Sequence, residues 1–122
     1  MSQKVIFVVT HGKDFKDRLE TPLHLASLAA MLDTEVSVIY TMAAGLLLKK
    51  GVPENLIPKE GKQPYIETLR DAKEEGVKIY VCSAALEIFD LKRDDFIKEV
   101  DDIVGGMFII TESLEADTVF TF

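Results

Sequence analysis

Residues 5–14 read VIFVVTHGKD, an unbroken β-branched and aromatic run that ends in a polar turn containing a glycine. Such a run is typical of a strand that is buried on both faces of a parallel sheet. An amphipathic stretch follows from Leu19 to Leu32, and Thr21-Pro22 suits the first turn of its helix. This order of strand, turn and helix is the opening of an α/β unit.

The same order recurs along the rest of the chain. Strands are predicted at Glu35–Tyr40, Val77–Val81 and Thr118–Phe122, with a brief strand or extended link at Asp102–Val104. Helices are predicted at Leu46–Gly51, Tyr65–Glu75, Ser83–Phe89, Arg93–Val100 and Met107–Glu115, and residues 52–64 are predicted to form a surface loop. We therefore expect an α/β fold: a single three-layer domain over residues 1–122, with about five mostly parallel strands flanked by helices.

Charge is distributed unevenly along the 122 residues. The chain has 14 basic and 21 acidic side chains, and the net charge of -7 argues against general binding to the nucleic acid backbone. Residues 1–81 hold 11 basic and 11 acidic side chains, whereas residues 82–122 hold 3 basic and 10 acidic ones. The simpler interpretation of this acidic third is a solvated face, and the alternative is a docking face for a basic partner.

Several classes of protein are not expected from the composition. The apolar runs are far shorter than the ~20 residues that span a bilayer, and MSQK leads straight into the first strand, so we expect no membrane segment and a cytoplasmic location. One cysteine and two separated histidines are too few for a zinc or iron site, so no metal is expected. No phosphate-loop fingerprint is present, and we expect no cofactor.

The single cysteine, Cys82, directly follows a predicted strand and precedes a predicted helix. Ligands of open α/β sheets bind beyond the carboxyl ends of the strands, where the loops at residues 11–14, 42–45 and 82–83 should meet. With Ser83 as the N-cap, Cys82 would lie at a helix N-terminus, which favours the reactive thiolate. The alternative is a buried cysteine that acts as a small hydrophobic residue.

Three other features are weaker candidates. His11 lies in the first loop, where it would serve as an acid, a base or a hydrogen-bond donor, or simply as a turn residue. His24 falls among apolar residues and is interpreted as a helix-face or interface histidine. A basic patch or a solvated loop accounts for the lysines near the second loop, which are Lys49, Lys50, Lys59 and Lys62.

The order of these segments resembles the DsrE/DsrF-like family of small sulfur-relay proteins over nearly the whole chain. The resemblance is carried by VVTHGKD (8–14), PLHLA (22–26), VSVIY (36–40), GLLLKKG (45–51), VKIYVCSAA (77–85) and EADTVFTF (115–122). It implies a sheet of about five mostly parallel strands and assembly as trimers or hexamers. It also implies that Cys82 accepts sulfane sulfur as a persulfide and passes it to a partner protein.

The resulting hypothesis is a sulfurtransferase-like carrier with Cys82 as the catalytic residue and with sulfur donor and acceptor proteins as partners. Helix-start amides near residues 83–85 would stabilise the anion, and the residues predicted to bind the substrate are His11, Gly12, Gly45, Ser83 and Ala84. Since no second cysteine is present, the sulfur would have to leave for another chain or protein.

Two alternatives come from other classes. Some relatives have been labelled peroxiredoxins, but a thiol peroxidase normally needs threonine or arginine around its cysteine, and the neighbours of Cys82 are Val81 and Ser83. Other relatives lack the cysteine and are structural subunits. The second alternative is therefore a non-catalytic oligomeric subunit that binds partners or a small ligand, with Cys82 buried.

Overall fold

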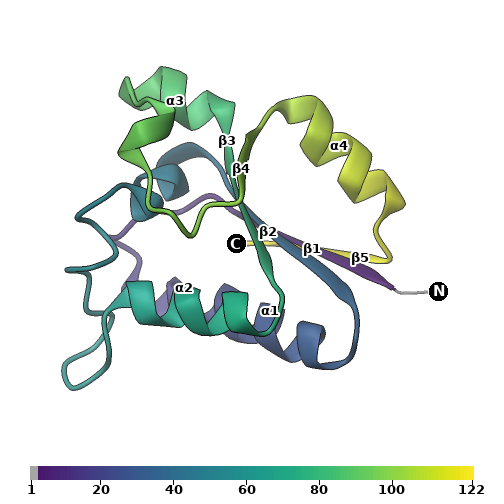
Figure 1. Cartoon of the computed structure of the whole chain (residues 1–122), viewed down its shortest axis with the longest axis horizontal. Coiled ribbons are helices and arrows are strands. Elements are labelled where there is room, and N and C mark those ends of the chain that lie inside the picture. Colours follow the sequence, from purple (N-terminus) through teal and green to yellow (C-terminus); the bar gives the residue numbers. More distant parts are fainter. Residues whose placement is uncertain (1–2) are drawn as a thin grey trace.

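The computed structural model describes residues 3–122, and the first two residues of the domain predicted over 1–122 lie outside them. The described residues form a five-stranded sheet in the order β4-β3-β2-β1-β5, and each pair of neighbouring strands is parallel (Figure 1). The strands are β1 (Lys4–Val9), β2 (Glu35–Tyr40), β3 (Lys78–Cys82), β4 (Asp102–Val104) and β5 (Thr118–Thr121). The predicted α/β fold is confirmed.

The connections between the strands are helical. The α-helices are α1 (Glu20–Met31), α2 (Tyr65–Glu74), α3 (Ser83–Phe89) and α4 (Gly106–Glu115), and the 3-10 helices are η1 (Lys16–Arg18), η2 (Met42–Leu48) and η3 (Arg93–Asp95). Pro22 lies in the first turn of α1, as its missing N–H allows. The helix predicted at Leu46–Gly51 is wrong in type and position, because η2 starts earlier and the backbone is already extended at Lys49.

The helix predicted over Arg93–Val100 is also wrong beyond its first turn. Only η3 is helical, and Phe96 is extended and forms an antiparallel bridge with Lys49. The next amide, that of Ile97, donates to the carbonyl of Leu48 at 3.0 Å. Phe96 and Ile97 are both buried. An extended backbone lets the segment bury both side chains beside η2, and this gain outweighs its helical propensity.

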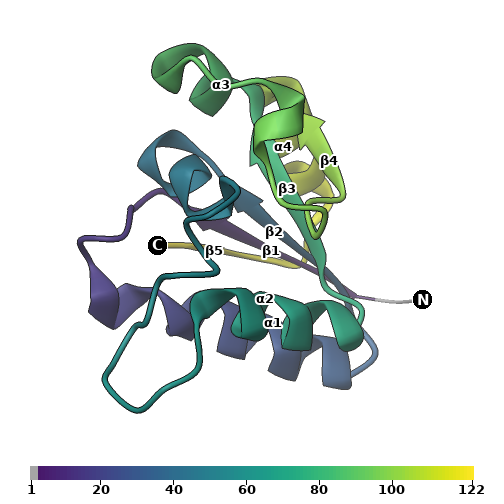
Figure 2. The same cartoon turned by 60° about the vertical axis from the view of Figure 1, so that its left-hand side comes forward.

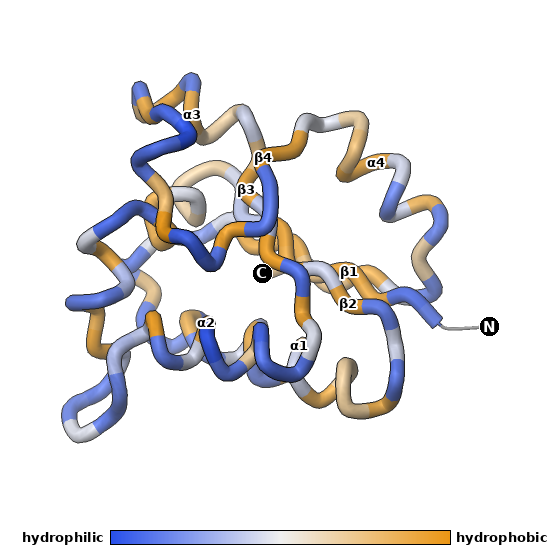
Figure 3. The backbone as a smooth tube through the Cα atoms, viewed as in Figure 1, coloured by the Kyte–Doolittle hydropathy of each residue, from blue (hydrophilic) through white to orange (hydrophobic). Residues whose placement is uncertain are grey.

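One face of the sheet is covered by α1 and α2, which lie next to each other along it (Figure 2). Strand side chains alternate between the two faces, so every second residue of each central strand enters this core. The hydrophobic parts of β1 and β2 lie at the centre of the molecule (Figure 3). The core under α1 and α2 includes Phe7, Val9, Leu23, Val38, Leu69, Ile79 and Val81, all at most 1% exposed.

The opposite face is covered by α4 and is much less enclosed (Figure 1). Its buried cluster consists of Ile6, Ile39 and Val104, with Tyr80 and Phe108 packed partly against it. The rings of Tyr80 and Phe108 meet edge to face, with centroids 5.0 Å apart. No residue of α4 is itself classed as buried. The helix therefore presents much of its apolar surface to solvent in the single chain.

A pair of buried tyrosines joins the end of β2 to the start of α2. The hydroxyls of Tyr40 and Tyr65 are 2.6 Å apart, and both side chains are almost completely enclosed. Burial raises the pKa of both phenols above the ordinary value for tyrosine. The neutral hydrogen-bonded pair is thus part of the core under α1 and α2.

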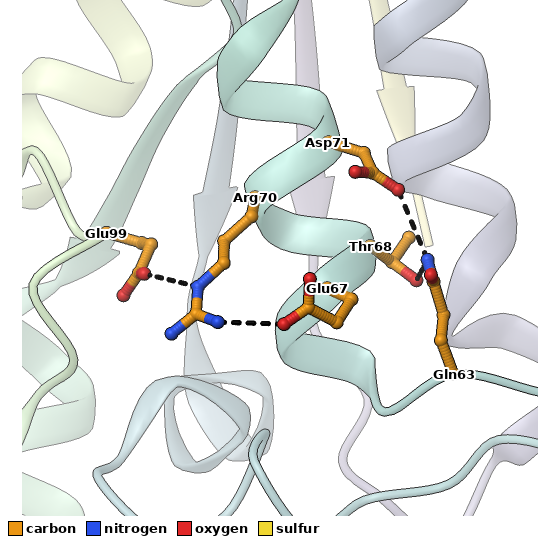
Figure 4. Close-up of polar contacts among 6 residues, drawn as sticks. All are labelled: Gln63, Glu67, Thr68, Arg70, Asp71 and Glu99. Carbon is orange, nitrogen blue, oxygen red and sulfur yellow. Dashed lines mark hydrogen bonds and ion pairs between the residues drawn. The ribbon is translucent and has the colours of Figure 1, made fainter.

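Carboxylates of the acidic segment, residues 82–122, form ion pairs with basic side chains of residues 1–81, the segment without net charge. Arg70 of α2 donates to Glu99 at 2.9 Å and to Glu67 at 2.8 Å, while Gln63 donates to Asp71 nearby (Figure 4). Two similar ion pairs join Lys73 to Asp101 and Lys4 to Glu112. Much of the acidic surplus after Cys82 is therefore balanced inside the fold, rather than forming one continuous acidic face.

Within residues 3–122, no helix has both the length and the apolar character needed to cross a bilayer.

Candidate functional site

Cys82 is the last residue of β3 and directly precedes α3. It pairs with Val104 of β4, so the strand stays in the sheet up to the cysteine. The predicted place of Cys82 at a strand end and helix start is confirmed. The prediction that Ser83 is the N-cap is wrong by one residue, because the helix begins directly from the strand and Cys82 itself occupies the N-cap position, with no side-chain capping bond.

The Cys82 side chain is 5% exposed and belongs to the less enclosed side of the sheet. Its neighbours Ile79 and Val81 enter the core under α1 and α2, whereas Tyr80 packs with Phe108 of α4. By the alternation of a strand, Cys82 projects on the same side as Tyr80. The thiol therefore projects toward the side of the sheet that the single chain covers least.

The start of α4 lies next to the end of β3, although none of its residues is among those predicted for the site. Gly105 is the N-cap of α4, and a Cβ placed on it would lie 3.9 Å from Oγ of Ser83. Gly105, Gly106 and Ser83 are exposed. Since α3 has seven residues and α4 has ten, α4 provides the longer helix dipole at this edge. The adjacent glycines Gly105 and Gly106 are the sequence feature that could have indicated this junction.

His11 is not brought next to Cys82 within one chain. It follows β1, and β2 lies between β1 and β3. The ring is 7% exposed, its Nδ1 is 3.4 Å from the Gly12 carbonyl oxygen, and its Nε2 is buried without a hydrogen-bond partner among residues 3–122. Phe15 packs edge to face against it at 6.4 Å. The substrate-binding role of His11 stays a prediction.

Gly12 lies in the loop beside η2, and Gly45 is a residue of η2 itself. A Cβ on Gly12 would be 3.5 Å from Cβ of Ala43, and Gly12 lines a cavity between its loop and η2. Gly45 faces α3: a Cβ there would come within 2.5 Å of Cβ of Ala85. Close packing of η2 on α3 thus requires glycine at position 45. Its predicted contact with substrate, like that of Gly12, stays a prediction.

Ser83 and Ala84 form the first turn of α3, directly after the cysteine. Ser83 is exposed and Ala84 is half-buried, so the structure places both beside Cys82, as expected from their sequence positions. Among the residues described, no three His, Cys, Asp or Glu side chains lie close enough together to hold a metal ion. The groups that the structure places at the end of β3 are a thiol and the starts of α3 and α4.

The fold and the site define a class of small α/β proteins, which have a parallel sheet with one cysteine at its carboxyl edge. The chain belongs to the DsrE/DsrF-like family, whose model matches residues 3–122. The predicted resemblance is confirmed, and membership of this family indicates a function of the sulfur-relay type.

Solved structures show the same fold. The YchN protein of E. coli is 20% identical, with a TM-score of 0.81, and the match covers 98% of this chain and 99% of that one. MTH1491 of Methanobacterium thermoautotrophicum, described as a protein of unknown function, is also 20% identical, with a TM-score of 0.71 and coverage of 99% and 100%. No curated protein matches the sequence. At this identity the two structures support the fold alone.

Proposed function

We propose that this protein carries sulfane sulfur as a persulfide on Cys82 and passes it to a partner protein. The main support is the position of the cysteine: the only thiol of the chain lies at the carboxyl edge of the sheet, between the starts of α3 and α4. Backbone N–H groups at helix starts have no partner within their own helix and favour a negative charge nearby. Membership of the DsrE/DsrF-like family agrees with this chemistry.

The transfer needs no cofactor. The Cys82 thiolate attacks the outer sulfur of a donor persulfide, the sulfur–sulfur bond of the donor breaks, and the donor leaves as a thiolate that takes a proton from solvent. Cys82 then holds the outer sulfur as its own persulfide, without net oxidation. A thiolate of the acceptor attacks that sulfur in turn and releases Cys82 as a thiolate. With one cysteine per chain, the second step requires another protein or another subunit.

Intact-mass spectrometry tests the first step. After incubation with a polysulfide donor and removal of excess reagent, the native protein should gain about 32 Da, which dithiothreitol should remove. Cys82→Ser is the matched control and should show no gain. A protein that stays unmodified, or a Cys82→Ser variant that gains the same mass, would contradict the proposal.

One observation favours a second candidate, the non-catalytic subunit. Cys82 is 5% exposed, and free cysteines in apolar surroundings are often inert. In that case the protein would contribute a binding surface to an assembly and the thiol would fill space. A thiol that resists alkylation in the native protein, together with a loss of stability in Cys82→Ala, would favour this candidate over the carrier.

The proposed assembly is a homo-oligomer, a trimer or hexamer, formed through α4. Met107, Ile110 and Leu114 follow one another at i, i+3 and i+7 on this helix and are 78%, 57% and 82% exposed. Such a stripe on a soluble surface marks an interaction site. Because α4 starts beside Cys82, a neighbouring subunit on this stripe would also border the cysteine. Light scattering of the purified protein, with Ile110→Glu as the disrupting variant, tests this assembly.

The proposed acceptor docks at the end of α3. Glu87, Asp90 and Asp94 have no ion-pair partner among residues 3–122, in contrast to the paired carboxylates of Glu99 and Asp101. Ile88 is 57% exposed among them. An acidic rim around an apolar residue suits a basic partner, in the reducing cytoplasm where we place the protein. Charge reversal at Glu87 and Asp90 should slow sulfur transfer to the acceptor without affecting loading of Cys82.

A further inference from the structure

A cavity of about 270 Å³ lies at the carboxyl edge of the sheet, away from Cys82. It is enclosed by the loop after β1 on one side and by η2 with the residues after it on the other. It lies beyond the carboxyl ends of the neighbouring strands β1 and β2, which is the edge of the sheet at which open α/β folds bind small ligands. The lining residues are Gly12, Lys13, Asp14, Ala43, Leu46, Leu47, Lys49 and Val52.

The inner part of the cavity is aliphatic. Ala43, Leu46 and Val52 are all half-buried, so each keeps some apolar surface open to the cavity. The absent side chain of Gly12 contributes to the space, because a Cβ there would reach van der Waals contact with Ala43 at 3.5 Å. Apolar surface left exposed in a concave site is the usual means of binding the hydrocarbon part of a small ligand.

The mouth of the cavity carries charge. Lys13 and Lys49 both line it, and neither forms an ion pair within the part of the chain that the structure describes. This contrasts with Lys4, Arg70 and Lys73, each of which is bound to a carboxylate. Asp14 is the one acidic residue of the lining, so the mouth has an excess of positive charge in a chain of net charge -7. This local reversal of sign favours an anionic ligand.

We propose that this cavity binds a small organic anion, a carboxylate with a short aliphatic body. The carboxylate lies between the ammonium groups of Lys13 and Lys49, and the hydrocarbon rests on Ala43, Leu46 and Val52. The cavity is slightly smaller than the ~300 Å³ that marks the lower end of common ligand pockets, which limits the ligand to a short chain.

This site differs from the sulfur-carrier site in its residues and its chemistry. Its lining contains neither the cysteine nor any residue of α3 or α4. The two sites share η2, whose Gly45 packs on Ala85 of α3 while Ala43 and Leu46 line the cavity, and they share Gly12, which is also a predicted residue of the sulfur site. The proposal holds whether or not Cys82 carries sulfur, so the two proposals fail separately.

Titration of the ¹⁵N-labelled full chain with hexanoate, followed by NMR, tests the proposal. Saturable shifts should be found at the amides of Gly12, Ala43, Leu46 and Val52, with a dissociation constant of roughly 1–10 mM for a ligand of about eight non-hydrogen atoms. Hexanamide provides the same body without the charge, and acetate provides the charge without the body. Both should bind several-fold more weakly. Equal binding of hexanamide would overturn the proposal, as would equal binding of acetate.

Substitutions in the cavity lining test whether hexanoate binds there. Lys13→Gln combined with Lys49→Gln should weaken hexanoate binding by about fivefold, since each exposed ion pair contributes modestly. Lys59→Gln with Lys62→Gln, on the nearby loop, is the matched control of equal charge and should leave binding unchanged. Ala43→Phe should fill the cavity and abolish binding, with an otherwise native spectrum. The proposal would be overturned if Lys13→Gln with Lys49→Gln and Ala43→Phe both bind hexanoate as the native chain does. It would also be overturned if hexanoate shifts only amides elsewhere.

Discussion

The two faces of the sheet differ in how completely one chain covers them. Under α1 and α2, residues such as Leu23, Leu69 and Ile79 are fully buried. Under α4, the buried cluster is small, and no residue of the helix itself is buried. We call the first face the finished core, because its residues are fully buried within the single chain. The second resembles half of an interface, because an apolar helix side is left in water.

The candidate sulfur site follows this division. Cys82 projects on the side of the sheet covered by α4, whereas Tyr40 and Tyr65 are enclosed in the core on the other side. The face under α1 and α2 is closed, whereas the α4 face leaves apolar side chains exposed. The following predictions test whether stability belongs to the first face and interaction to the second.

The largest difference is expected from truncation in the two cores. Leu23→Ala, in the finished core, should lower the free energy of unfolding by about 2–4 kcal/mol, because it leaves a cavity in a fully buried site. Phe108→Ala, under α4, should cost about 1–2 kcal/mol in the monomer, because the ring is only half-buried. Urea unfolding of both variants at low concentration measures this. Equal losses would contradict the division of the two faces.

The contact between η2 and α3 shows how the finished core supports the cysteine. Gly45→Ala should destabilise the protein by about 1–3 kcal/mol, since the new methyl group would overlap Ala85. The double variant with Ala85→Gly makes room for the methyl group and should regain part of the loss. Thermal unfolding of the three proteins distinguishes a steric cause, which the second substitution relieves, from a general intolerance of position 45, which it does not.

The tyrosine pair predicts how the finished core responds to alkaline pH. Burial raises the pKa of Tyr40 and Tyr65 in the folded state, so the stability of the neutral pair is complete below pH ~10, where unfolded tyrosines are still protonated. Above that pH the unfolded chain loses protons that the folded one keeps, and the free energy of unfolding falls by up to about 1.4 kcal/mol per pH unit for each tyrosine.

Denaturant unfolding between pH 9 and 11 measures this slope. The double variant Tyr40→Phe with Tyr65→Phe lacks both phenols and should have a shallower slope over the same range. Equal slopes for the variant and the native protein would show that the pair does not control alkaline stability.

The smallest effect on monomer stability is expected on the outer side of α4. Met107→Lys should change the free energy of unfolding of the monomer by no more than about 0.5 kcal/mol, because the side chain is 78% exposed. Self-association should weaken in the same variant, as sedimentation would show. A large loss of monomer stability, with association unchanged, would mean that α4 is packed within its own chain.

Much of the fold could be predicted because strong local patterns agree with the packing. The uninterrupted apolar run at residues 5–9 and the cysteine at the end of a β-branched run both lie where expected. Residues 93–100 could not be predicted, because their extended form depends on a bridge to Lys49, far away in the sequence. The cavity was missed for the same reason: Lys13 and Lys49 come together only through the neighbouring ends of β1 and β2.

The carrier function is tested by the rate at which iodoacetamide alkylates Cys82 in the native protein, compared with the urea-unfolded chain at pH 7. For a carrier we expect a native rate comparable to that of the unfolded chain, because the donor and the acceptor must both reach the thiol of Cys82. Cys82→Ser should show no labelling. A thiol that reacts only after unfolding would contradict the carrier function and leave Cys82 as a packing residue.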